Sequence, residues 1–384
     1  MIYVVGHVTR GFGAVQSLQS HLLRQGAEFC AIEHPLFAES ASTTQEFASV
    51  YRRYERGAVV VTHRGPCLRR PAALRFMKDA VYTVWCGMRE PRRIDLYIGV
   101  DNLNAFSGLI LRWLGKVRRV VFYTVDYAKA ARFPNPLLEV CYRWVDRIGV
   151  WGADEVWSVS DRIRQERFRW TQNPRKLRLV PNTVDLSKIP DMTTIFRTPD
   201  RLIFVGGVMQ GSGLDEVIEA MPMVRQTIPG VHLIIIGGGP WESSLRQLVE
   251  ARGLGEIVRF LGYRPYEEAL REIAQSSLGL SPYSPTAPEA PYLYYCDPSK
   301  VKAYLACGCP VVIYELPEVA HLIVREGAGI LYRSREEFAR AVVMLLQDVQ
   351  GLTRYRANAR RLAARYDQTL VLNRALDTVA PCAS

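Results

Sequence analysis

The sequence contains no run of about 18 apolar residues, the length that a membrane-spanning helix requires. Its start also lacks a basic leader followed by a long apolar stretch, since MIYVVG enters a predicted strand at once. Eight cysteines occur without any C-x-x-C pair, so neither a zinc knuckle nor a dithiol redox site is indicated. Scattered thiols of this kind are typical of a reducing cytosol. We therefore expect a cytoplasmic protein, either soluble or bound peripherally to the inner face of a membrane.

Sequence signals for nucleic-acid binding are also missing. We find no RNP-type aromatic motif, no zinc-finger spacing and no basic low-complexity arm. The formal net charge of +11 nevertheless implies attraction to something anionic: a nucleotide substrate, a phospholipid surface or a nucleic acid. Without a recognition motif, nucleic acid is the least favoured of these three partners.

What the sequence does contain is a repeated alternation of short, β-branched apolar runs with longer amphipathic stretches. This alternation predicts parallel sheets with crossover helices. The first series of predicted strands covers residues 2–6, 28–32, 58–62, 96–100, 120–124 and 156–160. The second series covers residues 201–206, 232–237, 257–261, 278–282, 310–314 and 328–332. The predicted fold is α/β, with two Rossmann-like, doubly wound domains that face a central cleft.

A polar stretch at 176–201, which contains three prolines and no sustained periodicity, separates the two series. We predict an N-terminal domain at 1–183 and a C-terminal domain at 184–352. The remaining segment, 353–384, is helical in pattern, and we expect it to pack across both domains.

The most informative segment is DPSKVKAYLACGCPVVI at 297–313. It resembles the signature P-x-K-x-x-E-Y-x-A-x-G-x-P-V-V of family 4 glycosyltransferases, which have the GT-B fold. The matching positions are Pro298, Lys300, Tyr304, Ala306, Gly308, Pro310, Val311 and Val312. Further segments follow the order of the family: VPNTVD (180–185), FVGGVMQGSGLDEVIEA (204–220), IIIGGGPWESSLRQL (234–248) and FLGYRPYEEAL (260–270).

The resemblance implies transfer of a sugar from a UDP- or GDP-linked donor to a glycan or lipid-linked acceptor. It implies retention of anomeric configuration, no bound metal and no cofactor besides the donor itself. The implied context is the synthesis of a cell-surface polysaccharide or glycolipid. The implied donor-binding residues are Gly206, Gly207, Ser212, Gly213, Tyr263, Arg264, Asp297, Ser299, Lys300 and Tyr304.

Elementary electrostatics agrees with this assignment. Breaking the bond between a sugar and a diphosphate builds negative charge on the leaving group, which fixed positive charge or helix N-terminal amides would stabilise. Lys300, in the first turn of a predicted helix, could offer its ammonium group alongside the amides of that helix, and it is a catalytic candidate. The alternative is a solvated lysine at a helix start. The glycines near Gly206 permit close backbone approach, although a plain tight turn explains them nearly as well. The family resemblance implies that the nucleobase lies near Tyr263 and Arg264; the alternative is that these two residues belong to an exposed loop.

Three departures from the family pattern bear on activity. Gly207 and Ser212 stand where the family has a basic pair, Ala303 replaces a glutamate, and Tyr295 stands where a second glutamate is expected. Two lost diphosphate contacts would remove about 1.5 to 3 kcal/mol each. The competing interpretations are a catalytically degraded relative that acts as a binding or scaffold partner, and another GT-B enzyme such as a nucleotide-sugar epimerase or a phosphorylase.

In the N-terminal half, two side chains follow predicted strands and are catalytic candidates. His7, near the loop that contains Arg10 and Gly11, could contact the acceptor or the transition state, or it could be structural. Asp126, in YTVDY, could orient a nucleophilic hydroxyl group, or it could cap a turn.

The segment from Arg69 to Arg93 is amphipathic at helical spacing. Its apolar positions are Leu74, Met77, Val81, Val84, Trp85 and Met88, and seven arginines and lysines lie among them. Such a stripe most often faces a core. With this much positive charge, it could instead hold the protein against an anionic leaflet that contains a lipid-linked acceptor.

Overall fold

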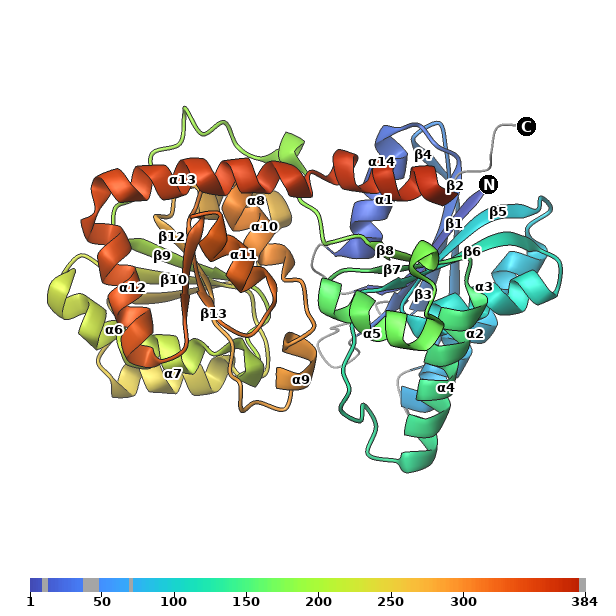
Figure 1. The fold of residues 1–384 in the computed structure, drawn as a ribbon, viewed down its shortest axis with the longest axis horizontal. Coiled ribbons are helices and arrows are strands. Elements are labelled where there is room, and N and C mark those ends of the chain that lie inside the picture. Colours follow the sequence, from blue (N-terminus) through green and yellow to red (C-terminus); the bar gives the residue numbers. More distant parts are fainter. Residues whose placement is uncertain (9–12, 37–47, 69–71, 380–384) are drawn as a thin grey trace. The chain divides into compact units, whose positions relative to one another are not determined.

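The computed structural model describes residues 1–8, 13–36, 48–68 and 72–379, which form two units (Figure 1). The first unit comprises Met1–Pro181 with Gln368–Ser384, and the second comprises Asn182–Asp367. The division therefore falls two residues before the predicted boundary, and the chain crosses back to the first unit between Asp367 and Gln368.

The first unit is built on an eight-stranded sheet with the order β4-β3-β2-β1-β5-β6-β7-β8. Its elements are β1 (Ile2–Val8), α1 (Ala14–Arg24), β2 (Phe29–Pro35), β3 (Ala48–Glu55), β4 (Ala58–Cys67), α2 (Ala72–Arg89), β5 (Ile94–Val100), α3 (Asn102–Trp113), β6 (Val117–Thr124), α4 (Pro136–Gly152), β7 (Glu155–Ser158), α5 (Asp161–Thr171), β8 (Leu177–Leu179) and α14 (Gln368–Val379). In the helix layer that includes α2, α3 and α4, helix α3 packs against both of the others.

The outer part of this sheet corrects the sequence prediction. β2, β3 and β4 pair antiparallel, whereas a parallel arrangement was expected for residues 58–62. Only Arg56 and Gly57 separate β3 from β4, and both have positive φ. A two-residue loop joins antiparallel strands, because a parallel connection needs a crossover. β3 itself and the three-residue β8 were not predicted.

The second unit contains a fully parallel six-stranded sheet with the order β11-β10-β9-β12-β13-β14, and all six predicted strands are confirmed. Its elements are β9 (Arg201–Val205), α6 (Leu214–Thr227), β10 (His232–Ile236), α7 (Glu242–Ala251), β11 (Val258–Gly262), α8 (Tyr266–Ala274), β12 (Leu278–Ser281), α9 (Ala290–Leu293), α10 (Ser299–Ala306), β13 (Val311–Tyr314), α11 (Val319–Arg325), β14 (Gly329–Tyr332), α12 (Arg335–Gln347) and α13 (Val349–Ala363). Both faces of this sheet are buried: Leu202 and Phe204 belong to one core cluster, and Ile203 belongs to the other. The α/β fold class with two Rossmann-like units is therefore confirmed.

The C-terminal segment is divided between the units. Helix α13 belongs to the second unit, whereas α14 packs against α1 in the first. The side-chain amide of Gln368 donates to the Ser17 carbonyl at 2.6 Å and so fixes the start of α14. Among the helices that the structure describes, none is both long and apolar enough to cross a membrane.

Candidate functional site

In the second unit, the predicted donor residues gather after the carboxyl ends of the parallel strands, where doubly wound sheets bind their ligands. Gly206 and Gly207 follow β9, and Tyr263 and Arg264 follow β11. The loop after β9 lies against the loop after β10, since Val208 N donates to the Gly238 carbonyl at 3.1 Å. A Cβ atom on Gly237 would overlap the Gly206 carbonyl, so this close approach of two backbones requires glycine.

Lys300 occupies the first turn of α10 and points toward this loop. Its Nζ lies 4.2 Å from the ring centre of Phe204 and 5.2 Å from that of Tyr283, and within about 4 Å of where a Cβ on Gly206 would stand. Burial lowers the pKa of the Lys300 ammonium to about 8. None of the ion pairs found among the described residues involves Lys300. The ammonium is therefore mostly charged at neutral pH and has no carboxylate to neutralise it.

The amino end of α10 adds to this positive potential. Its cap residue, Pro298, has no side chain that could accept a hydrogen bond from the first-turn amides. Ser299, the first helical residue, is exposed. A helix end that lacks a side-chain cap presents its amides and the positive end of the helix dipole to an anion. Lys300 and the start of α10 thus form one anion-binding arrangement.

Asp297, unlike Lys300, forms an ion pair and hydrogen bonds with other residues that the structure describes. Its carboxylate forms a buried ion pair with Lys302 and accepts a hydrogen bond from Asn182 N at 2.8 Å. The Asn182 side chain in turn donates to the Asp297 carbonyl at 2.6 Å. Asp297 therefore ties the start of the second unit to the entry of α10, and its side chain is already used by the protein.

Three other predicted donor residues also make internal contacts. The Ser212 hydroxyl donates to the Met209 carbonyl at 2.6 Å. Tyr304 is fully buried, and its hydroxyl oxygen accepts from Val205 N at 2.8 Å, which holds the end of β9. Gly213 has a φ of 63°, and a Cβ there would lie 2.7 Å from the backbone of Tyr283. These contacts shape the backbone around Lys300.

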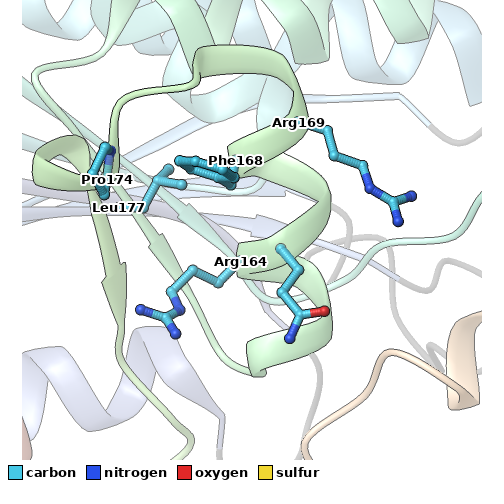
Figure 2. Close-up of a pocket in the computed structure, with 6 residues that line it drawn as sticks. Arg164, Phe168, Arg169, Pro174 and Leu177 are labelled. Atoms are coloured by element: carbon cyan, nitrogen blue, oxygen red, sulfur yellow. The ribbon is translucent and has the colours of Figure 1, made fainter.

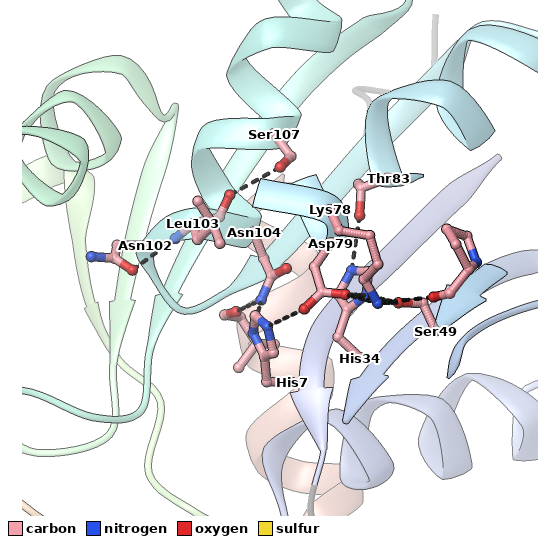
Figure 3. Close-up of polar contacts among 12 residues, drawn as sticks. His7, His34, Ser49, Lys78, Asp79, Thr83, Asn102, Leu103, Asn104 and Ser107 are labelled. Carbon is pink, nitrogen blue, oxygen red and sulfur yellow. Dashed lines mark hydrogen bonds and ion pairs between the residues drawn. The ribbon is translucent and has the colours of Figure 1, made fainter. Parts of the chain in front are cut away.

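In the first unit, His7 lies in a buried polar network with Asp79, His34 and Asn104 (Figure 3). The Asn104 amide, a donor, lies 3.1 Å from His7 Nδ1, so the other ring nitrogen carries the proton toward Asp79 at 3.4 Å. Ser49 and Lys78 contact the second oxygen of Asp79 at 2.8 and 2.6 Å. Both nitrogens of His7 are thus occupied by the protein, which fits its structural alternative.

The same network perturbs two titrations. Burial lowers the pKa of His34 to about 4, which keeps the ring neutral. Burial alone would raise the pKa of Asp79, but hydrogen bonds from His34, His7 and Lys78 hold it well below its usual range. The ionised carboxylate of Asp79 therefore organises the network.

Asp126 follows β6 and lies beside a second carboxyl group, Asp101, which the sequence analysis missed. Arg132 pairs with Asp126 at 3.3 Å and also donates to the Tyr142 hydroxyl at 3.2 Å. Burial, and then the charge of Asp126, raise the pKa of Asp101 to about 7; burial also raises the pKa of Asp126. Asp101 has φ 71° and ψ 164°, a conformation essentially restricted to glycine. Strain at a perturbed carboxyl group is a feature of functional sites.

A surface pocket of about 350 Å³ lies elsewhere in the first unit, on α5 and β8 (Figure 2). Its arginines are already in ion pairs, Arg164 with Asp161 and Arg169 with Glu166. None of the predicted site residues lines it. The lining residues are Arg164, Gln165, Phe168, Arg169, Pro174 and Leu177.

Comparison with known proteins decides the family. Residues 199–348 match the family model described as Glycosyl transferases group 1. The second unit belongs to the group 1 glycosyltransferases. The resemblance seen in the sequence is thereby confirmed, and it coincides with the segment that contains Lys300.

Two known proteins are similar to parts of this chain. WcaL of Escherichia coli, a proposed colanic acid biosynthesis glycosyltransferase, is 22% identical over 286 residues, which cover 70% of this chain and 65% of WcaL. A GDP-mannose-dependent α-(1-6)-phosphatidylinositol monomannoside mannosyltransferase of Mycobacterium tuberculosis is 30% identical over 136 residues, covering 33% of this chain and 35% of the enzyme. The chain thus spans less than two thirds of either relative.

Among solved structures, Anabaena HepE in complex with UDP superposes over 99% of both chains with a TM-score of 0.70 and 16% identity. At this identity the likeness establishes the fold alone. The architecture is that of GT-B glycosyltransferases.

The group 1 glycosyltransferase unit also contains a residue that the sequence analysis missed. Glu289 precedes α9, and its Oε2 is buried without a hydrogen-bond partner among the residues that the structure describes. It faces the loop before α6, because a Cβ on Gly211 would lie 3.0 Å from this oxygen. Tyr295 and Ala303, at the positions of the two expected glutamates, are both buried. Glu289 is therefore a carboxylate near the donor loops that falls outside the family's spacing. Arg10 and Gly11 lie outside the described residues.

Proposed function

We propose that this protein transfers a sugar from a nucleoside-diphosphate sugar to a glycan or lipid-linked acceptor, with retention of configuration. The observation that supports this proposal most directly is Lys300, an ammonium without a carboxylate partner at the uncapped start of α10. Its position suits the diphosphate of the donor.

In the proposed reaction, the bond between the anomeric carbon and the diphosphate oxygen breaks, and its electron pair stays on the diphosphate. An acceptor hydroxyl oxygen bonds to the anomeric carbon, and its proton passes to the departing phosphate oxygen. Lys300 and the α10 amides would stabilise the charge that develops on that oxygen. Backbone amides near Gly207 and Ser212 would replace the basic pair of other family members. No metal ion is needed in this scheme.

Two further assignments belong to the proposal. Tyr263 and Arg264, which are exposed after β11, would contact the nucleobase. Asp126, with Asp101 and Arg132, would hold the acceptor hydroxyl groups in the first unit, because carboxylates and guanidinium groups hydrogen-bond sugars readily. The relatives named above favour cell-surface glycans or glycolipids as products, and both UDP and GDP remain candidate donor nucleotides.

Calorimetry with UDP, GDP and ADP tests the donor site directly. We expect micromolar binding of one nucleotide to the unmodified protein and at least tenfold weaker binding to Lys300→Met. Lys188→Met is the matched control, since Lys188 lies in the same unit and pairs with Glu267 on the surface. Absence of binding by any nucleotide at millimolar concentration would favour the scaffold interpretation. A new nucleotide-linked sugar formed without acceptor would favour an epimerase.

A further inference from the structure

Five of the six apolar positions of the α2 stripe lie on the protein surface, which corrects the more usual interpretation of such a stripe; the sixth, Val84, packs against the core of the first unit. Five side chains at intervals of three or four residues expose 38% to 67% of their area. The opposite face of the helix is buried and includes Asp79, Tyr82 and Cys86. The exposed set is Leu74, Met77, Val81, Trp85 and Met88. Arg69 and Arg70, which precede the helix, lie outside the described residues.

The two neighbouring helices extend this apolar surface. On α4, the exposed positions include Leu137, Val140, Trp144 and Trp151. At the end of α3, which packs between α2 and α4, Trp113 is exposed and contacts Phe106 edge to face. Large apolar side chains exposed on three neighbouring helices are typical of an interaction site.

The charges on these helices all have one sign at the surface. The four acidic residues of α2, α4 and the turn after α2 are buried: Asp79, Glu90, Glu139 and Asp146. Each contacts a basic or hydroxyl group of the protein. The outward positions instead include arginines, and two of them lie over exposed tryptophans: Arg89 is 4.1 Å from the Trp85 ring and Arg147 is 5.9 Å from the Trp144 ring.

The distribution of charge between the units points the same way. The first unit contains 29 lysines and arginines against 17 acidic residues, whereas the second contains 20 against 21. The positive charge of the whole protein therefore belongs to the unit that exposes the apolar helices. A second copy of the chain would bring two such basic faces together and repel, whereas an anionic bilayer would attract them.

We propose that the outer faces of α2, α3 and α4 dock this protein on an anionic phospholipid bilayer. Trp85, Val81 and Met77 would enter the interfacial region, and the arginines would contact lipid phosphates, as in other interfacial amphipathic helices. Docking would bring the first unit to a membrane that contains a lipid-linked acceptor.

Vesicle flotation tests this proposal. We expect the protein to float with vesicles of equal parts phosphatidylglycerol and phosphatidylcholine. The bound fraction should fall at least fivefold in 0.5 M salt, where the screening length is about 4 Å, and also on pure phosphatidylcholine, which has no net charge. The double variant Met77→Glu with Val81→Glu should lose at least tenfold in binding to the anionic vesicles. Val349→Glu is the control, because Val349 is as exposed as Val81 but lies on α13 of the second unit.

Nucleotide binding is measured on every variant, so that a failure of the donor site is separated from a failure of docking. The proposal is overturned if the unmodified protein does not float, or if the double variant floats as well as the control. It is also overturned if sedimentation shows a dimer that the double variant converts to monomer, since the face would then be a protein interface.

Discussion

The two units differ in their match to the family model, in their net charge and in the apolar side chains that they expose. The second unit matches the group 1 glycosyltransferases, has almost no net charge and contains a fully parallel sheet. The first unit lies outside the family match, contains the excess of positive charge and exposes apolar helices. The family match and the excess of positive charge therefore lie in different units.

The buried polar groups of the two units provide the sharpest contrast. In the second unit, the Lys302 side chain is completely buried and forms an ion pair with Asp297. We expect Lys302→Met to lower the free energy of unfolding of this unit by about 3 to 5 kcal/mol, because it leaves a buried carboxylate without its partner. Hydrogen exchange resolved by unit measures the loss. Adding Asp297→Asn should restore more than half of it, and Lys188→Met should change stability by less than about 1 kcal/mol.

The first unit should instead respond to pH. His34 has a pKa of about 4 in the folded protein against an ordinary value of 6.5, so the unfolded chain binds its proton first. Stability is complete above pH 6.5 and decreases as the pH falls toward 4, by about 3 kcal/mol in total. Below pH 4 the low pKa of Asp79 adds a further loss. Urea unfolding across this range measures the slope, and His34→Gln should flatten it. An equal loss in the second unit would contradict the assignment.

Much of the second unit could be predicted from the sequence, whereas less of the first could. Continuous runs such as HLIII at β10 are buried on both faces and so identify a parallel strand directly. β3, with the sequence ASVYRRYE, mixes polar and apolar side chains and can be recognised as a strand only together with its hairpin partner β4. Lys300 could be predicted as a site residue from a sequence motif, whereas Glu289 and Asp101 could not. Their significance lies in a missing hydrogen-bond partner and a backbone conformation, which only coordinates show.

Glu289 tests whether the second unit has replaced the glutamates of its relatives. We expect Glu289→Gln to weaken binding of the nucleoside-diphosphate sugar about tenfold, since one charge-assisted hydrogen bond to a sugar hydroxyl would be lost. The free energy of unfolding should not fall, because Glu289 Oε2 has no hydrogen-bond partner among the described residues that the substitution could break. Calorimetry measures both binding and any change in enthalpy. Glu267→Gln, on the surface of α8, serves as the control, and equal affinity in both variants would exclude Glu289 from the donor site.

Asp101 tests the corresponding idea for the first unit. Its φ of 71° costs a non-glycine residue on the order of 1 kcal/mol or more, so Asp101→Gly should raise the free energy of unfolding by about 1 kcal/mol. Removing the carboxyl group should at the same time lower sugar transfer to the proposed acceptor while nucleotide binding stays intact. Thermal unfolding and a transfer assay on one preparation measure both. A variant that is less stable, or that transfers normally, would show that the strained conformation serves no acceptor, whereas a more stable and less active variant would show that the strain is kept for function.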